Sequence, residues 1–452
     1  MLYPFFSSLL SPIFTSFPLD FLFAGSVCAM YAASLITLSR IYSAYKVGLM
    51  HVGGLFYGQT LANLISLAIT YILACVLARR LLNPLAGFGC AVVQALFSAG
   101  WTISANRLYF SLHKPKRTVV IYRGESDLRK LEEIRFFAER WSVERTVQWD
   151  EENVHDLPYK KETPGGRSFE AIQKLMRIME DYEAVFVSGV SATLRNGIVK
   201  YCVEKNKACY FVPHTGDVII SGAEHIRSFS VPICRARRSR PAPEYLLLKR
   251  AMDILLSLLA IIVTSPFMAI AALAIWSYDH GPVLYKQVRL TKDGRLFEIL
   301  KLRSMIVDAE KGGARLAGEH DDRITPVGRI IRAIRFDELP QLFNILRGDM
   351  SIVGPRPERP EIAEQYRKEL PAFDLRLQVK AGLTGYAQIY GRYNTEPQDK
   401  LKMDLMYINH ASLAEDIKLI FATVRILFMR ESTSGVADGQ TTASAVEKEK
   451  SA

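Results

Sequence analysis

Long apolar runs constrain this chain more than any other feature of its sequence. Three of them, Phe21–Leu38, Val52–Leu77 and Leu85–Ile103, fall within the first 110 residues. Each is close to the length of about 20 apolar residues that crosses a bilayer as a helix. A water-soluble bundle with these helices in its core is the alternative, but it would leave little polar surface to face water. We therefore expect three transmembrane helices within residues 1–112.

Two details of this segment bear on its topology. Residues 1–17 are also apolar, but three prolines interrupt them, so a fourth span stays an open alternative. Four basic residues follow the third run between positions 107 and 117, and positive flanks favour the cytoplasmic side. We expect the rest of the chain on that side, although Arg79-Arg80 then lies outside, against the same tendency.

Residues 116–237 have the pattern of an α/β module. A buried-strand pattern at Thr118–Tyr122 is followed by a helical pattern from Asp127. The later expected elements are a helix over Phe169–Met179 and strands over Ala184–Val187 and Ala208–Val212. Such alternation predicts a parallel, Rossmann-like sheet. The glycine fingerprint for nucleotides is missing after the first strand, which favours a scaffold without a ligand over a nucleotide-binding or regulatory module.

A fourth apolar run, residues 251–278, carries Ser265-Pro266 in its middle. Proline removes a helical hydrogen bond and clashes with the preceding turn, so we expect a bend there. Either a kinked helix spans the bilayer, or the bend returns the chain to the side it entered, and the residues alone leave both open. Asp253 near the start of the run favours an end close to the lipid headgroups.

Residues 245–430 form the next expected domain, of mixed α+β type. Strands over Val283–Leu290 and Leu296–Leu300 flank a Lys-Asp-Gly turn, which is typical of a hairpin. Helices are expected over Glu361–Glu369 and Leu413–Met429, the second amphipathic and suited to a membrane interface or to a core-facing position. The Ser/Thr/Glu/Lys-rich tail 431–452 is expected to be disordered.

The densest chemistry lies in Arg335–Pro357, where Asp337 and Glu338 are adjacent carboxylates. Neighbouring carboxylates repel each other, so a divalent cation or arginines must offset their charge. Magnesium commonly binds through one or two carboxylates together with substrate phosphates. The surrounding basic residues suit phosphate oxygens: Lys301, Arg303, Arg329, Arg332, Arg335, Arg347 and Arg356.

A carboxylate can also act as a nucleophile and form an acyl phosphate. The arrangement therefore fits phosphoryl transfer from a diphosphate. The alternative, that Asp337 and Glu338 only stabilise the start of a helix, is equally consistent with their spacing.

The net charge and the cysteines limit which partners and which structural sites this chain can have. A net charge of +11 on a chain with membrane segments favours anionic lipids or phosphorylated substrates as partners. No zinc-finger spacing or basic-aromatic RNA motif is present, so we expect no nucleic-acid partner. The six cysteines include no CxxC pair, which argues against a disulfide framework or a zinc site.

The segment from Tyr245 to Phe428 resembles the bacterial sugar transferase family, the monotopic phosphoglycosyl transferases. The matching pieces, in order, are KRAMDILLSLLAIIVTSPF, GPVLYKQVRLTKDGRLFEILKLRSM, DDRITPVGRIIRAIRFDELPQLFNILRGDMSIVGPRPE, KAGLTGYAQIYGRYN and KLKMDLMYI. An ordered series of this kind is far more specific than any lone motif. The layout of membrane helices, α/β module and catalytic domain resembles the large form of the family.

The resemblance implies a two-step reaction at the bacterial cytoplasmic (inner) membrane. Asp337 matches the nucleophile that attacks the diphosphate of a UDP-sugar and releases UMP, and Glu338 matches its partner, associated with magnesium. Undecaprenyl phosphate then takes the phosphosugar, which starts an exopolysaccharide or capsule unit. Glucose 1-phosphate and galactose 1-phosphate are the leading candidates for the transferred group, and the 1-phosphates of N-acetylated sugars are the alternative. Large members of the family can pair through their membrane helices, so a homodimer is an open alternative for this chain. Contacts with polysaccharide assembly proteins are another open alternative.

The resemblance also assigns supporting residues. Ser265-Pro266 matches the pair that makes the apolar run re-entrant. A second set matches basic and rigid substrate-binding positions: Lys301, Arg303, Arg335, Pro355, Arg356 and Pro357. The Gly382–Gly385 loop with Gln388 and Arg392 matches a motif that shapes the nucleotide pocket. Family members often have proline before that loop, where this chain has Ala381.

Two other classes compete with this enzyme. A non-catalytic, nucleotide-sensing membrane scaffold of a polysaccharide assembly system would have no need of the intact carboxylate pair. A hydrolase or kinase of lipid phosphates would need a phosphate-binding P-loop or a catalytic Cys or His motif, and the sequence has neither.

Overall fold

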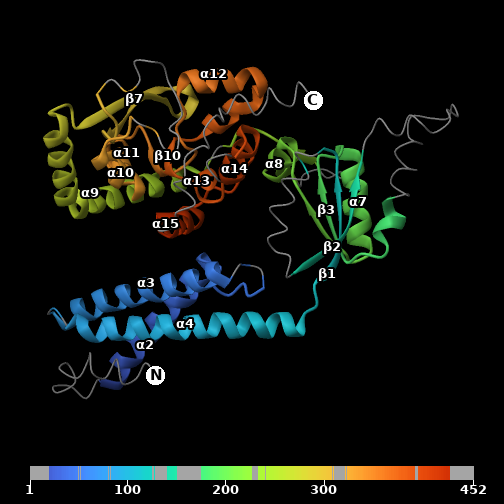
Figure 1. Cartoon of the computed structure of the whole chain (residues 1–452), viewed down its shortest axis with the longest axis horizontal. Helices are drawn as coiled ribbons and strands as arrows, with labels where there is room; N and C mark the ends of the chain where they lie inside the picture. The colour runs from blue at the N-terminus through green and yellow to red at the C-terminus, as the bar shows by residue number, and fades with distance from the viewer. Residues whose placement is uncertain are drawn as a thin grey trace. The chain divides into compact units, whose positions relative to one another are not determined.

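The computed structural model divides into two compact units, Met1–Val212 and Pro213–Ala452, which are described separately (Figure 1). The described residues are 20–48, 50, 52–79, 81, 83–124, 127, 140–149, 175–226, 233–239, 241–307, 309, 321, 323–391 and 395–427. The expected helix after Asp127, most of the one over Phe169–Met179, the N-terminal residues 1–17 and the tail 431–452 lie outside them.

The first unit begins with three apolar helices, α2 (Asp20–Ile41), α3 (Val52–Ala78) and α4 (Pro84–Leu112). Buried polar side chains link α3 and α4: Asn63 Nδ2 donates to Ser98 Oγ at 3.0 Å, and Thr102 Oγ1 to Gln59 Oε1 at 3.0 Å. Side-chain hydrogen bonds of this kind satisfy polar groups that lipid cannot. Within the described residues, Val52–Val76 and Gly87–Leu112 are long and apolar enough to cross a membrane, whereas Gly25–Ile41 of α2 is a shorter apolar helix.

A four-stranded parallel sheet follows, in the order β2-β1-β3-β4. Its strands are β1 (Lys116–Tyr122), β2 (Trp141–Gln148), β3 (Ala184–Ser188) and β4 (Ala208–Phe211), and helix α7 (Ala192–Glu204) joins the last two. Alternate residues of β1 and β3 enter two separate apolar clusters, so the central strands are buried on both faces. Strand β2 is absent from the sequence prediction, because its polar residues hide the alternation.

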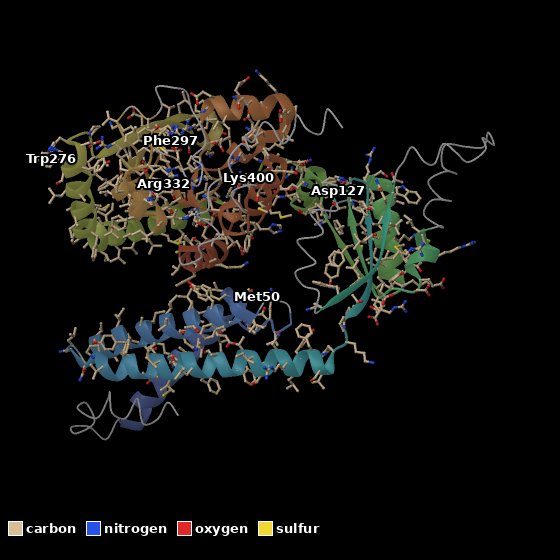
Figure 2. All side chains as sticks on the ribbon, viewed as in Figure 1. Met50, Asp127, Trp276, Phe297, Arg332 and Lys400 are labelled. Carbon is tan, nitrogen blue, oxygen red and sulfur yellow. The ribbon has the colours of Figure 1, made fainter. Side chains whose placement is uncertain are left out.

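The second unit contains the long helix α9 (Pro243–Asp279), 37 residues with Pro266 in its interior. Figure 1 shows that α9 is bent rather than straight, as expected for a helix with an internal proline. Its outward residues are apolar, and Trp276, 49% exposed, points away from the domain (Figure 2). This is the third helix of the described chain with the length and composition to cross a membrane, and the three make the chain a membrane protein.

The remaining elements of the second unit fold around one apolar core. They are α8 (Thr215–Ser221), β5 (Glu224–Ile226), β6 (Ile233–Arg235), β7 (Leu284–Leu290), η2 (Lys292–Gly294), β8 (Leu296–Leu302), α10 (Pro326–Ala333), η3 (Phe336–Glu338), α11 (Gln341–Arg347), β9 (Ser351–Val353), α12 (Pro360–Glu369), η4 (Pro371–Gln378), β10 (Gly382–Thr384), α13 (Tyr386–Ile389), α14 (Pro397–Asn409) and α15 (Leu413–Leu427). The β7–β8 hairpin is antiparallel and its turn lies at Lys292–Gly294, which confirms the prediction.

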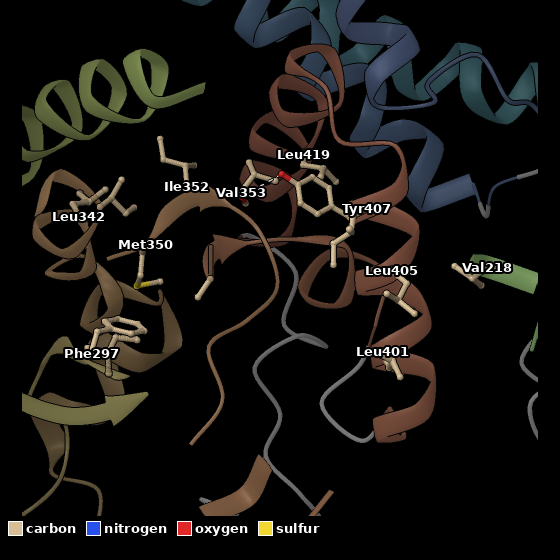
Figure 3. Packing of buried hydrophobic residues seen from close by; sticks show 14 residues of the cluster. Val218, Phe297, Leu342, Met350, Ile352, Val353, Leu401, Leu405, Tyr407 and Leu419 are labelled. Carbon is tan, nitrogen blue, oxygen red and sulfur yellow. Dashed lines mark hydrogen bonds between the residues drawn. The ribbon is translucent and has the colours of Figure 1, made fainter. Parts of the chain in front are cut away.

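Figure 3 shows the packing of this core, in which Met350 and Leu401 are fully buried. Tyr407 reaches from α14 to the end of β9, where its hydroxyl donates to the Val353 carbonyl at 3.3 Å. The sequence groups residues 213–237 with the α/β module, whereas α8 of this stretch packs on α14: Val218 joins the core and Asn409 donates to its carbonyl at 2.6 Å. The core thus connects α9 to strands β8 and β9.

Candidate active site

Three separate elements bring charged side chains together around Glu338. Lys301 lies near the end of β8, Glu338 at the end of η3, and Arg356 in the segment that follows β9. Lys301 Nζ lies 3.1 Å from Glu338 Oε1, and Arg356 Nη2 lies 2.9 Å from the same oxygen. One carboxylate oxygen therefore accepts from two cations that are 37 and 18 residues away in the chain.

The Glu338 side chain is only 14% exposed, whereas that of Arg356 is 45% exposed. Burial by itself raises the pKa of Glu338, but the positive charges of Arg356 and Lys301 outweigh burial and hold it well below its usual range. Burial also lowers the pKa of Lys301, which the charge of Glu338 opposes. Glu338 is thus ionised over the ordinary pH range, and the side chain of its partner Arg356 stays partly open to solvent.

Asp337 differs from its neighbour in its partners. Among the described residues, no hydrogen bond or ion pair reaches its carboxylate. Burial raises its pKa, the charge of Lys301 opposes this, and the adjacent charge of Glu338 adds to it. An anion that is partly desolvated and uncommitted to any partner has the properties of a nucleophile or of a cation ligand.

The backbone before the carboxylate pair is strained. Arg335 has a φ of 53°, in the left-handed region that a side chain with a Cβ rarely adopts. Such conformations persist where the surrounding structure enforces them, often at functional sites. The turn at Arg335 ends the approach from α10 and directs η3 so that Glu338 faces β8. The charge of Arg335 also lies close enough to help lower the pKa of Glu338.

The segment Pro355-Arg356-Pro357 lies against the predicted glycine loop. Gly382 N donates to the Pro355 carbonyl at 2.8 Å, and Gly354 N donates to the Thr384 carbonyl at 2.8 Å. The two backbones approach so closely that a Cβ on Gly382 would overlap Gly354. Gln388 lies at the far end of this loop, where its amide donates to the Leu383 carbonyl at 3.3 Å. Arg392 lies outside the described residues.

Ala381, which stands where family members often have proline, makes two backbone hydrogen bonds. Its amide N–H donates to Thr291 Oγ1 at 3.1 Å, and its carbonyl accepts from Ser351 N at 2.9 Å. A proline at this position would have no N–H to donate. The alanine thereby ties the glycine loop to the start of the β7–β8 turn.

Arg303 and Ser265-Pro266 lie away from the Glu338 cluster. Arg303 Nη2 donates to Asp279 Oδ1 at the end of α9, and its side chain is 7% exposed. Ser265 Oγ donates to the Ile262 carbonyl within α9, one turn earlier. Arg303 therefore has the position of an anchor for the membrane helix, two residues beyond Lys301 on the same chain segment.

The opposite end of α9 is bonded to the same domain. Arg250 donates to the carbonyls of Ile345 and Leu346 at 2.6 and 2.8 Å, at the C-terminus of α11. Asp253, 3% exposed, accepts from Ile352 N on β9 at 3.1 Å. Neither contact follows from sequence spacing, although a carboxylate within an apolar run was a signal that Asp253 has a buried partner.

The oxygen donors suit a magnesium ion only in part. No cluster of three or more His, Cys, Asp or Glu side chains occurs in the described part of the chain, so a cage made by protein alone is absent there. Magnesium does not require one, because it commonly uses one or two carboxylates with substrate phosphates and water. The uncommitted carboxylate of Asp337 fits this role better than Glu338, one of whose oxygens already accepts from two cations.

Known proteins resemble the second unit most clearly. The family described as "Bacterial sugar transferase" matches residues 244–430. A protein of Aeromonas hydrophila, named UDP-N-acetylgalactosamine-undecaprenyl-phosphate N-acetylgalactosaminephosphotransferase, is 42% identical over 190 residues, 41% of this chain and 45% of its own length. The putative undecaprenyl-phosphate N-acetylgalactosaminyl 1-phosphate transferase of Bacillus subtilis (strain 168) is 46% identical over 152 residues, which cover 33% of this chain and 85% of that protein.

A third relative matches a longer stretch of this chain. The UDP-glucose:undecaprenyl-phosphate glucose-1-phosphate transferase of Escherichia coli (strain K12) is 34% identical over 280 residues, 59% of this chain and 60% of its own. Of these three, the chain spans two over about half of their length and the Bacillus protein over most of it. The resemblance drawn from the sequence motifs is confirmed, and the chain belongs to the bacterial sugar transferase family.

Proposed function

We propose that this protein transfers a sugar 1-phosphate from a UDP-sugar to undecaprenyl phosphate and so begins an exopolysaccharide or capsule repeat unit. The observation that carries the proposal is the uncommitted carboxylate of Asp337 beside a Glu338 that Lys301 and Arg356 hold. The relatives' names, which include UDP-glucose and UDP-N-acetylgalactosamine donors and undecaprenyl phosphate as acceptor, support the substrate classes.

In the first step, an oxygen of Asp337 forms a bond to the phosphorus that carries the sugar. The bond from that phosphorus to the bridging oxygen breaks, and UMP leaves with the electron pair. Arg356, whose side chain is 45% exposed, can donate to phosphate oxygens while it keeps its contact with Glu338. Lys301, 19% exposed, adds positive charge near the developing anion.

In the second step, a phosphate oxygen of undecaprenyl phosphate attacks the same phosphorus. The bond to Asp337 breaks, and its carboxylate is restored together with a lipid diphosphosugar. Glu338 keeps Lys301 and Arg356 in place through both steps, because its low pKa leaves it ionised throughout. Magnesium, held by Asp337 and by Glu338's remaining oxygen, would offset the negative charge of the diphosphate.

We further propose that α9 is re-entrant and that the catalytic domain lies on the cytoplasmic face of the inner membrane. Support comes from both ends of α9: Arg250 and Asp253 bond to α11 and β9, and Asp279 bonds to Arg303. The bonded residues Arg250 and Asp279 would be about 44 Å apart in a straight helix, and a straight helix that crossed the bilayer would place them on opposite sides of about 30 Å of hydrocarbon. The bend at Pro266 removes this conflict.

The α/β module is proposed to be Rossmann-like in the broad sense of a doubly wound α/β fold, and its strand order β2-β1-β3-β4 matches the flavodoxin-like form of that fold. The relatives' names differ in the sugar, with glucose, galactose and N-acetylgalactosamine all represented, so each is a candidate donor for this chain. Pairing of two copies through the membrane helices and association with polysaccharide assembly proteins remain predictions.

The decisive experiment uses membranes that contain the full chain, a panel of UDP-sugars and magnesium. We expect UMP release and a lipid diphosphosugar with at least one sugar. Without acceptor, sugar from a radiolabelled donor should attach to the protein and be released by hydroxylamine, as an acyl phosphate is. Asp337→Asn should abolish both signals because an amide is a poor nucleophile.

The matched control is Asp293→Asn. Asp293 lies exposed in the β7–β8 turn with a φ of 57°, a conformation that asparagine also adopts readily. The Asp293→Asn protein should therefore retain wild-type activity. Full activity of Asp337→Asn protein would contradict the nucleophile assignment.

A further inference from the structure

The backbone carbonyls of Arg356 and Pro357 are held by side chains, whereas strand β10 holds the carbonyl of Pro355 through Gly382 N. Both neighbours of Arg356 are prolines, which have no N–H to donate to a β-ladder. Two arginines supply the donors: Arg376 Nη2 donates to the Arg356 carbonyl at 3.0 Å, and Arg289 Nη1 donates to the Pro357 carbonyl at 3.2 Å. The direction of the Arg356 side chain therefore depends on partners elsewhere in the fold.

Arg376 is itself immobilised. Its Nε and Nη2 lie 2.9 and 2.8 Å from Asp404 Oδ2 on α14, and its guanidinium carbon lies 4.9 Å from the centre of the Phe373 ring. The side chains of Arg376 and Asp404 are 5% and 1% exposed. At this depth neither side chain has a surface to offer a substrate, so the guanidinium acts on protein groups only.

The same guanidinium thus makes two kinds of contact. Nε and Nη2 bond the carboxylate of Asp404, which fixes where Arg376 lies, and Nη1 lies 3.9 Å from Glu358 Oε2. Nη2 also donates to the carbonyl of Arg356, the residue whose side chain lies 2.9 Å from Glu338. If Arg376 and Asp404 served only to join η4 to α14, the ion pair between them would be enough and the hydrogen bond to the Arg356 carbonyl would not be needed.

We propose that Arg376, fixed by Asp404, is a positioning residue that sets Arg356 against Glu338 and the substrate phosphates. This rests on the proposed function, in which Arg356 contacts the diphosphate. Misplacement of a contacting group by about 1 Å can cost on the order of 100-fold in rate, so an indirect contact of this kind can matter as much as a direct one.

The test is a double-mutant cycle on kcat for UMP release. Arg376→Lys keeps the charge but cannot bond Asp404 through two nitrogens and the Arg356 carbonyl at once. We expect it to lower kcat by about 10- to 100-fold. Arg356→Gln alone should also lower kcat. In the Arg356→Gln background, Arg376→Lys should then change kcat by less than about twofold, because the residue it positions is already gone.

Arg367→Lys is the matched control. Arg367 also bonds an aspartate through Nε, at 3.0 and 2.8 Å from the two oxygens of Asp374, but its hydrogen bonds to described residues go to Asp374 and Glu364 and to none of the 355–357 segment. It should leave kcat within about twofold of wild type in either background. If the double variant instead lost kcat by the product of the two single losses, the positioning role of Arg376 would be overturned and only a general structural role would be left.

Asp404→Asn serves if Arg376→Lys protein does not fold. It keeps the shape of the partner and removes the charge that fixes Arg376, so its loss of kcat should also vanish in the Arg356→Gln background. Wild-type protein that releases UMP from no UDP-sugar would contradict the proposed function instead. The same cycle measured on UDP affinity would then decide the positioning role, with non-additive effects supporting it and additive effects overturning it.

Discussion

Asp337 and Glu338 are adjacent in the chain, yet their surroundings shift their pKa values in opposite directions. Glu338 accepts from Lys301 and Arg356, and their charges hold its pKa well below the usual range. Asp337 has no such partner among the described residues, and burial raises its pKa. A pair of carboxylates with divergent pKa values can divide two roles, one permanently charged and structural, the other reactive.

The pH dependence of activity follows from this difference. A nucleophilic carboxylate must be ionised, so kcat/KM should fall as pH falls through the raised pKa of Asp337, above the about 3.9 of an ordinary aspartate. Lys301→Met removes a charge that lowers this pKa, so the acid limb should move to higher pH and kcat should fall at least about tenfold. A pH–rate profile of both proteins measures this.

Lys286→Met is the control for that variant, since Lys286 is an exposed lysine on β7 paired with Glu298. Its profile should match that of wild type. An acid limb that stays in place, or moves to lower pH, in Lys301→Met protein would show that Asp337 does not set it.

At the scale of elements, α11 and β8 are joined by one fully buried side chain. Asn344 Oδ1 accepts from Leu300 N at 3.0 Å, and its Nδ2 donates to the Glu298 carbonyl at 2.7 Å. The amide thereby replaces a neighbouring strand along the free edge of β8. It fixes the register between the strand that carries Lys301 and the helix that follows Glu338.

Asn344→Asp should be destabilising, because it replaces the donor by a carboxylate oxygen that faces the Glu298 carbonyl. Leaving a buried carbonyl without a donor costs about 1–3 kcal/mol, and more when a charge is buried with it. Thermal unfolding in detergent micelles should show a lower Tm. Asn206→Asp, at an exposed position with a φ of 51°, is the control and should leave Tm unchanged. An equal Tm for Asn344→Asp and wild type would contradict the role of Asn344.

The sequence could predict features made by residues that are neighbours in the chain, but not contacts between residues that are far apart in it. The β7–β8 hairpin was predictable because Asp293 and Gly294 both adopt positive φ in a short turn between apolar strands. The carboxylate pair was predictable because its members are adjacent. The partner of Arg303 was not, since Asp279 lies 24 residues away, on the other side of the β7–β8 hairpin.

The pair of Arg376 and Asp404 was missed for the same reason. The two residues are 28 positions apart, in η4 and α14, which only tertiary packing brings together. Strand β2 was missed because its exposed polar residues resemble a loop. Local patterns thus identified the carboxylate pair as the candidate site, whereas the contacts between distant residues around it could be seen only in the tertiary structure.

At the scale of the whole molecule, the proposed topology puts both flanks of α9 on one side of the membrane. In a variant without its six native cysteines, Glu244→Cys and Lys292→Cys place single thiols before and after the apolar run. Because the ends of α9 bond to one domain, we expect an impermeant maleimide to label both only after cells are permeabilised.

Leu81→Cys provides the opposite case. Leu81 is 86% exposed between α3 and α4, and the basic residues after α4 favour the cytoplasm for the other end of that helix. It should be labelled in intact cells. Labelling of Glu244→Cys and Lys292→Cys from opposite sides would refute the re-entrant topology.

The bonds at both ends of α9 also bear on which bilayers suit this protein. A helix that crosses a membrane must match the thickness of the hydrocarbon layer, and a mismatch is relieved by tilt or by deformation of the lipid. In the proposed topology α9 enters and leaves through one leaflet, so no second headgroup layer fixes its length. Bilayer thickness would then act on α3 and α4, while the depth of α9 is fixed by the domain that holds Asp337. Chemistry on a long lipid would thereby be independent of how thick the surrounding membrane is.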